Sequence, residues 1–209
     1  VLDCHLGTVV GLAPHPAGGA FLTAGSDGSV RLWGAKDGAL LSKRTFSSAQ
    51  TAMATAPGGS GAALAAVGSA TGVLRLLALP TDPAAAAASG GVRVTYRRRL
   101  HTAPITSIAF SPKANVLVSA GRDNSVWLVS VSPRTGSATA LGNVVAPEPV
   151  LSIAWPEVTD ADESVLISLA SGGIMCIAIP AELLTPGWRN LSPDMVLKPS
   201  AGAAAAAAS

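Results

Sequence analysis

One spacing recurs within this chain and constrains its fold more than any other feature. A histidine is followed by a hydroxyl residue, an aspartate and a tryptophan at offsets of 18, 22 and 28 residues: His5, Thr23, Asp27 and Trp33. A second copy starts 96 residues later and has valine in the last place: His101, Ser119, Asp123 and Val129. Repetition over tens of residues is typical of propellers and solenoids. We therefore expect a fold built from copies of one small unit.

Each copy divides into four short runs of strand-forming residues, separated by turns rich in Gly, Asp and Ser. In the first copy these runs cover residues 9–12, 21–24, 30–33 and 40–46. In the second copy they cover residues 105–110, 116–120, 126–131 and 138–145. Apolar runs bounded by such turns indicate strands, and four short strands per unit are typical of a propeller blade. The sequence therefore predicts an all-β propeller of four-stranded antiparallel blades.

Two further units are degenerate. They lack the histidine, aspartate and tryptophan of the marker positions but keep comparable strand-like runs, such as Leu74–Leu77 in the place of Val30–Trp33. With them the chain is expected to hold about four blades, at residues 5–46, 49–99, 101–145 and 149–180.

Three segments fall outside the blade pattern. Residues 80–91 (PTDPAAAAASGG) are expected to be a disordered insertion, because so short an alanine run hardly forms a stable isolated helix. Residues 181–199 are interpreted as a linker or partial strand. Residues 200–209 form a low-complexity alanine tail.

Composition excludes several function classes. The net charge is +2 with 12% charged residues, which gives no strong electrostatic footprint for nucleic acid or an anionic membrane. The cysteines Cys4 and Cys176 stand in apolar surroundings without metal-ligand spacing, so we expect both to be reduced core residues. No cofactor loop or metal cluster is recognised, and a cytoplasmic protein without cofactor or metal is expected.

The repeated set resembles that of the WD-repeat (WD40) family over roughly residues 5 to 180. In that family a histidine, a serine or threonine, an aspartate and a tryptophan form a hydrogen-bonded network inside each blade. The resemblance therefore implies a structural role for the two marker sets. The pattern departs from the family at Gly34, which stands where the aspartate of the WD dipeptide would be.

The same residue types could be interpreted as an enzyme site. Ser119, His101 and Asp123 are the ingredients of a hydrolase triad, yet no nucleophile elbow such as GxSxG accompanies them. The loop Gly25–Gly28 lacks the phosphate-binding pattern and precedes a strand rather than a helix. We expect no enzyme activity, although a propeller with an enzyme site in its central funnel is the second function class considered.

Two features are candidate partner contacts. The run Arg97, Arg98 and Arg99 is either a solvated strand end or a patch for an acidic partner segment. Trp127 takes the place held by Arg31, at an outward position of a third strand. It either packs between blades or, if exposed, anchors a partner, because tryptophan is enriched at interface hot spots.

Four blades are too few for the seven-blade ring that WD-repeat propellers usually resemble. The chain starts at Val1 without methionine, and a clear fourth strand is missing after Ile179. We therefore expect an incomplete ring whose remaining blades come from the rest of the same chain.

These features favour a scaffold that mediates protein–protein interactions within a large assembly. The marker-poor last unit is similar to the terminal blades of large cilia- and flagella-associated WD-repeat proteins, which implies a tethering role on the ciliary axoneme. Subunits of vesicle-coat or transport, nuclear-pore and ubiquitin-ligase complexes are the alternative scaffolds.

Overall fold

The computed structural model describes residues 4–58, 63–86, 90–155 and 164–179. These residues form fifteen strands in four antiparallel sheets, which we call blades 1 to 4. Blade 1 contains β1 (Val9–Pro14), β2 (Ala20–Gly25), β3 (Ser29–Gly34) and β4 (Leu40–Thr45). Blade 2 contains β5 (Gln50–Thr55), β6 (Leu64–Ser69), β7 (Val73–Ala78) and β8 (Arg93–Arg99). Blade 3 contains β9 (Ile105–Phe110), β10 (Val116–Gly121), β11 (Ser125–Val131) and β12 (Ala138–Val145). Blade 4 contains β13 (Val150–Ala154), β14 (Ser164–Leu169) and β15 (Ile174–Ala178).

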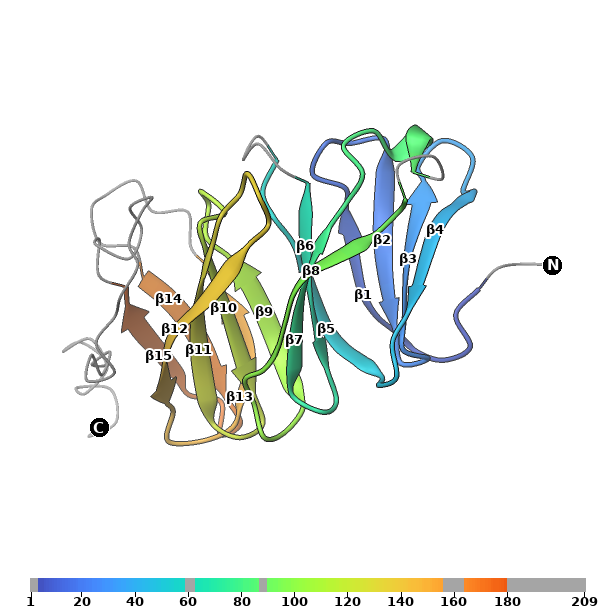
Figure 1. Cartoon of the computed structure of the whole chain (residues 1–209). Helices are drawn as coiled ribbons and strands as arrows, with labels where there is room; N and C mark the ends of the chain where they lie inside the picture. The colour runs from blue at the N-terminus through green and yellow to red at the C-terminus, as the bar shows by residue number, and fades with distance from the viewer. Residues whose placement is uncertain (1–3, 59–62, 87–89, 156–163, 180–209) are drawn as a thin grey trace.

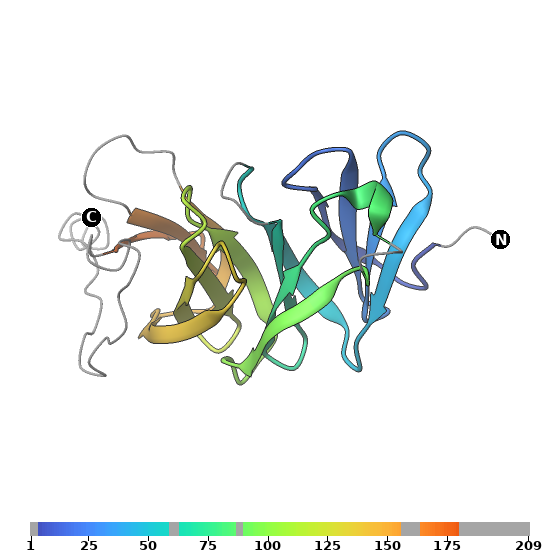
Figure 2. The same ribbon diagram turned by 45° about the horizontal axis from the view of Figure 1, so that its top comes forward.

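The blades stand side by side in chain order and form part of a β-propeller (Figures 1 and 2). Their first strands, β1, β5, β9 and β13, contact one another in sequence and form the inner side of the row. Blades 1 and 4 lie at opposite ends, and no strand of one pairs with a strand of the other among the described residues. The predicted all-β propeller fold is confirmed, and the four blades form an open arc.

The burial of each strand follows from its place in the row of blades. The middle strands β6 and β10 are buried at every position, because each of their faces contacts a neighbouring blade. The outer strands β4 and β8 are largely exposed. Small and β-branched apolar side chains suit such thin layers, which explains how the chain forms a core with only 4% aromatic residues.

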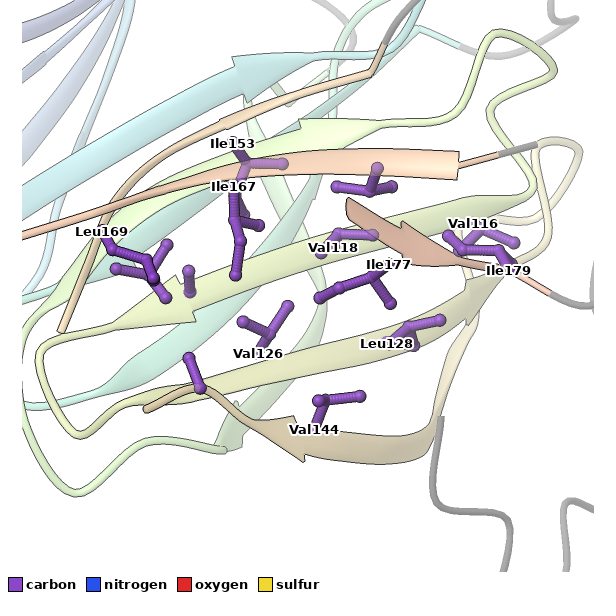
Figure 3. Close-up of a cluster of buried hydrophobic side chains, with 14 residues drawn as sticks. Val116, Val118, Val126, Leu128, Val144, Ile153, Ile167, Leu169, Ile177 and Ile179 are labelled. Atoms are coloured by element: carbon purple, nitrogen blue, oxygen red, sulfur yellow. The ribbon is translucent and has the colours of Figure 1, made fainter. Parts of the chain in front are cut away.

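Each pair of neighbouring blades encloses one apolar cluster. Between blades 3 and 4, Val118 and Val126 face Ile153 and Ile167 (Figure 3). A second cluster joins blades 2 and 3, and a third joins blades 1 and 2. Hydroxyls on the inner strands add direct links: Thr51 donates to the carbonyl of Ile105 over 2.7 Å. Thr106 donates likewise to the carbonyl of Val150 over 2.6 Å.

The turn between the second and third strand of each blade fixes one backbone conformation. The third residue of this turn has a positive φ in all four blades: Gly28 (79°), Gly72 (75°), Asn124 (62°) and Gly172 (89°). Glycine and asparagine tolerate this left-handed region, which explains the residue types at this position.

Two expectations need correction. In the expected disordered insertion, residues 83–85 form the 3₁₀ helix η1 (Pro83–Ala85), and Ala86 is 1% exposed within the cluster between blades 1 and 2. The alanine segment is ordered there because its small methyl group completes that cluster; residues 87–89 lie outside the described residues. Cys4 is exposed and Cys176 half-buried, so neither is a fully buried core residue. The expected linker and alanine tail, residues 181–209, also lie outside the described residues.

Candidate functional site

The first marker set forms one continuous hydrogen-bonded network in blade 1. The carboxylate of Asp27 only accepts, so Nδ1 of His5 donates to Oδ1 over 3.0 Å. Nε2 of His5 lies 2.7 Å from the hydroxyl oxygen of Thr23. Nε1 of Trp33 donates to the same hydroxyl oxygen over 2.8 Å. The network joins the loop before β1 to β2, the following turn and β3.

Two further residues belong to this network, and the sequence reasoning missed both. The buried hydroxyl of Ser29 donates to Oδ1 of Asp27 over 2.8 Å and lies 3.0 Å from Nδ1 of His5. Arg31 is 2% exposed, and its Nη2 lies 3.3 Å from Oδ2 of Asp27. Its guanidinium also lies 6.0 Å from the centre of the Trp33 ring. The outward position expected for Arg31 is therefore wrong, because the guanidinium turns inward to the carboxylate.

Blade 3 repeats the arrangement. Nδ1 of His101 lies 3.0 Å from Oδ1 of Asp123, and its Nε2 lies 3.0 Å from the hydroxyl of Ser119. Ser125 takes the place of Ser29 and donates to Asp123 over 2.7 Å. Val129 is fully buried in the cluster between blades 2 and 3, so apolar packing replaces the indole. A serine at offset 24 from the histidine in both copies is the signal that would have revealed Ser29 and Ser125.

The networks hold these groups in defined charge states. Burial raises the pKa of Asp27, but hydrogen bonds from His5, Ser29 and Leu6 outweigh it and hold that pKa well below its usual range. The pKa of Asp123 is lowered in the same way, by Ser125, His101 and Thr102. Burial lowers the pKa of His101, against a smaller opposing effect of Asp123. The folded state therefore favours ionised aspartates and a neutral His101.

In blade 3, Ser119, His101 and Asp123 are hydrogen-bonded in the same order as a catalytic Ser–His–Asp triad. Unlike a catalytic serine, however, Ser119 is not accessible to solvent. Ser119 is 0% exposed and His101 1% exposed, so the hydroxyl cannot contact a substrate in this structure. A nucleophile must reach the reacting atom, so this geometry supports a structural role.

The described residues contain neither a cluster of metal ligands nor a membrane-spanning helix. No three His, Cys, Asp or Glu side chains gather there closely enough to hold a metal ion. In the same part of the chain, no helix is long and apolar enough to cross a membrane.

The marker positions of blades 2 and 4 are filled differently. In every blade, the pairing of the first strand with the second skips one residue at the same place. Equivalent positions of the four blades can therefore be aligned. In blade 4 this alignment puts apolar residues at the histidine, hydroxyl and tryptophan positions: Ala146, Ile167 and Ile177. In blade 2 Phe46 takes the place of His5, and Thr71 takes the place of Asp27. Blade 2 nevertheless keeps an arginine, Arg75, at the position of Arg31.

Arg75 is buried against the phenyl ring that replaces the histidine. It is 3% exposed, and its guanidinium carbon lies 4.6 Å from the centre of the Phe46 ring. Within the described residues, Nη1 of Arg75 is buried without a hydrogen-bond partner. Burial lowers the pKa of Arg75, and the nearby charge of Arg97 lowers it further.

The candidate partner contacts occupy different surroundings. Arg97, Arg98 and Arg99 are all exposed on β8, the edge strand of blade 2. Arg97 pairs with Arg75 across the sheet and Arg98 pairs with Leu74, so their side chains point to opposite faces. Trp127 is half-buried and packs against the cluster between blades 2 and 3.

Comparison with known proteins agrees with this geometry. The family model described as "WD domain, G-beta repeat" matches residues 1–34 and 93–130, which include both hydrogen-bonded networks up to Trp33 and Val129. The chain contains WD40 repeats. Blades 1 and 3 carry the marker sets that the family model matches, and the degenerate blades 2 and 4 complete the arc.

Two relatives of this WD40-repeat chain carry the same name. It is 48% identical to "Cilia- and flagella-associated protein 43" of Chlamydomonas reinhardtii over 94% of this chain. It is 27% identical to the protein of that name from Xenopus laevis over 68% of this chain. The chain spans 13% and 8% of the length of these relatives, respectively.

Proposed function

We propose that this chain is the WD40 part of a non-catalytic scaffold that mediates protein–protein interactions in cilia and flagella, as a tethering component of the axoneme. The observation that carries the proposal is the 48% identity over 94% of the chain to a cilia- and flagella-associated protein. A propeller offers loops and edge strands for binding and requires no chemistry of its own, so function depends on its surface.

The polar residues of the two marker sets form hydrogen bonds within their own blades, which supports a non-catalytic role. His5 and His101 each have both ring nitrogens engaged by the side chains of their own blade. The hydroxyls of Thr23 and Ser119 are engaged in the same networks. These groups link the strands and turns within each blade and leave recognition to exposed residues such as Arg97–Arg99.

The two ends of the arc support the proposal that further blades of a longer protein complete the ring. On β15, Ile174 is 73% exposed, and on the adjacent strand β14 Leu166 is 37% exposed. At the other end Phe21 and Trp33 stack with ring centres 6.3 Å apart on the face of blade 1 that points away from blade 2. Propeller blades normally cover such faces with their neighbours, which also protects the edge strands from aggregation.

Localisation of the full-length protein tests this proposal. A tagged version expressed in a flagellated cell should remain with the axoneme after detergent removes membrane and soluble matrix. Chemical cross-linking and mass spectrometry should then identify axonemal neighbours of residues in this arc. Recovery with coat proteins, nuclear pores or ubiquitin-ligase adaptors, without axonemal retention, would refute the ciliary role.

A separate assay tests the non-catalytic part. The purified protein and its Ser119→Ala variant are compared for hydrolase activity and for circular dichroism. We expect no turnover from either protein. Turnover that disappears in a correctly folded Ser119→Ala variant would overturn the scaffold assignment.

A further inference from the structure

The buried guanidinium of Arg75 lacks the carboxylate that its counterpart in blade 1 has. Arg31 occupies the same position of the third strand and lies 3.3 Å from Oδ2 of Asp27. In blade 2 the aspartate position holds Thr71, so the blade cannot supply that carboxylate. Arg75 stacks on Phe46, and its buried Nη1 has no hydrogen-bond partner in the described residues. An unpaired buried charge costs stability, so an anionic group would stabilise this position.

Two exposed arginines lie on the faces of blades 1 and 2 that look toward each other. Arg97 is the direct cross-strand neighbour of Arg75, on the face of blade 2 that looks toward blade 1. Arg44 pairs with Val30, which places it on the face of blade 1 that looks toward blade 2. The backbone N–H of Val92 donates to the Ser42 hydroxyl over 3.3 Å, which shows that this face of β4 meets blade 2. We call Arg44, Arg75 and Arg97 the interblade arginine cluster.

Protection against aggregation does not explain this cluster. Charged residues on an edge strand prevent pairing with another chain, and this accounts for exposed arginines on β8. It does not account for Arg75, which is 3% exposed and belongs to β7, a strand paired on both sides. Burying a guanidinium beside the like charge of Arg97 costs folding free energy, and the protection of an edge strand does not require it. Such an arrangement favours an anionic ligand.

We propose that the interblade arginine cluster attracts an acidic segment of a partner protein to the outer edge between blades 1 and 2, where the exposed Arg44 and Arg97 bind its carboxylates and the buried charge of Arg75 adds to the attraction. The inference rests on the proposed scaffold function and specifies the chemistry of one of its partners. The edge strand β8 is accessible from outside the arc (Figure 1), so an extended segment can approach Arg97 along it. Arginine binds carboxylates in a bidentate, directional manner, which suits recognition of glutamate and aspartate side chains.

A peptide-binding experiment separates this site from general electrostatic attraction. A fluorescein-labelled peptide rich in glutamate is titrated with the full chain, and fluorescence anisotropy gives the Kd. Arg97→Glu should weaken binding about tenfold or more, as expected for loss of a close charge pair. Arg98→Glu is the matched control, because it makes the same charge change one residue along β8 on the opposite face. Its Kd should change far less; equal losses would overturn the proposal.

The variant Arg75→Met tests the buried member. Methionine keeps the apolar stem against Phe46 but removes the charge. We expect the thermal midpoint of the free protein to stay the same or rise, while affinity for the acidic peptide falls several-fold. Unchanged affinity in a folded Arg75→Met variant would contradict the proposal. If that variant does not fold, Arg75→Gln, which also removes the charge but keeps a polar end, takes its place; wild-type affinity in a folded Arg75→Gln variant would overturn the proposal.

Control ligands distinguish the class of partner and the source of a failure. A peptide with glutamine in place of glutamate should not bind detectably. A single-stranded oligonucleotide or anionic vesicles that bind as tightly as the acidic peptide, with the same dependence on Arg97, would overturn the choice of a protein segment. These assays use purified protein, so failure of peptide binding leaves axonemal localisation intact, and failure of localisation leaves the peptide Kd intact.

Discussion

The hydroxyl of Ser29 donates to Oδ1 of Asp27 over 2.8 Å, at the centre of the blade 1 network. The backbone N–H of Ser29 reaches the same oxygen over 3.0 Å. The serine therefore fixes both the carboxylate and the tight turn that precedes β3. Ser125 and Asp123 reproduce the relationship in blade 3. This hydroxyl is as much a part of the repeated unit as the histidine.

Removal of the Ser29 hydroxyl tests that statement. Ser29→Ala should lower the free energy of unfolding by about 0.5–1.5 kcal/mol, the usual net value of one hydrogen bond. Chemical denaturation followed by circular dichroism measures the change. The exposed Ser47 provides a matched control, because Ser47→Ala removes a hydroxyl outside the network. Equal stability of the two variants would show that Ser29 contributes nothing beyond its backbone.

The aspartates should matter more than the serines. Asp27→Ala leaves the buried ring of His5 and the guanidinium of Arg31 without their acceptor, which should cost about 1–3 kcal/mol. Asp123→Ala should cost somewhat less, because blade 3 has no arginine at the position of Arg31 and no tryptophan in its network. Denaturant titration of both variants checks that Asp27→Ala loses more stability than Asp123→Ala. An unchanged stability of Asp27→Ala together with lost partner binding would refute the structural role of the network.

The networks should also make stability depend on pH. The folded-state pKa of His101 is lowered, so the unfolded chain takes up a proton first as the pH falls below about 6.5. The buried His15 has a lowered pKa as well and acts in the same direction. Stability should thus be complete above that pH and decline on acidification.

A second loss should follow below about pH 4, where Asp27 and Asp123 take up protons in the unfolded chain but resist them in the folded one. Denaturant unfolding at a series of pH values measures both windows. The His101→Gln variant should show a smaller loss of stability between pH 7 and 5, and its second window should shrink as well, because His101 contributes to the lowered pKa of Asp123. A wild-type slope in that variant would show that His101 is not the titrating group.

The repeated spacing predicted the fold class and the marker residues, although the repeated serines Ser29 and Ser125 were missed, and features that are present once gave no signal. His5 and His101 repeat with fixed spacing, so the fold class and both networks could be inferred from it. The contact of Arg75 with Phe46 occurs only in blade 2, and its two residues are far apart in the chain, so no spacing signals it. The order at Ala86 depends on its packing in the apolar cluster between blades 1 and 2, which local propensity does not encode.

Blade 3 should not accept the tryptophan that blade 1 contains. Val129 is 0% exposed, and the cluster between blades 2 and 3 fills the space where an indole would lie. Val129→Trp should therefore lower the free energy of unfolding by about 1–3 kcal/mol through overpacking, although it brings the marker set closer to the family pattern. The variant Val129→Ile, with one extra methylene, is the milder control. Stabilisation by tryptophan would show that the blades can separate to admit it.

The turn glycines allow backbone strain to be separated from steric contact. Gly72 and Gly172 both have positive φ, 75° and 89°, at the same place in their blades. A Cβ at residue 172 would have no heavy atom within 4 Å among the described neighbours, whereas a Cβ at residue 72 would collide with the backbone carbonyl of His101. Gly172→Ala should cost only the left-handed strain, about 1–2 kcal/mol.

Gly72→Ala should cost measurably more, because the carbonyl of His101 belongs to the connection between blades 2 and 3 and must move. That movement also shifts the imidazole of His101 relative to Asp123. Denaturant unfolding of both variants gives the difference, and the His101 resonances in a nuclear magnetic resonance spectrum should shift only in Gly72→Ala. Equal costs in the two variants would mean that the loop before β9 yields freely. The blade 3 network would then not be fixed to blade 2 at this point.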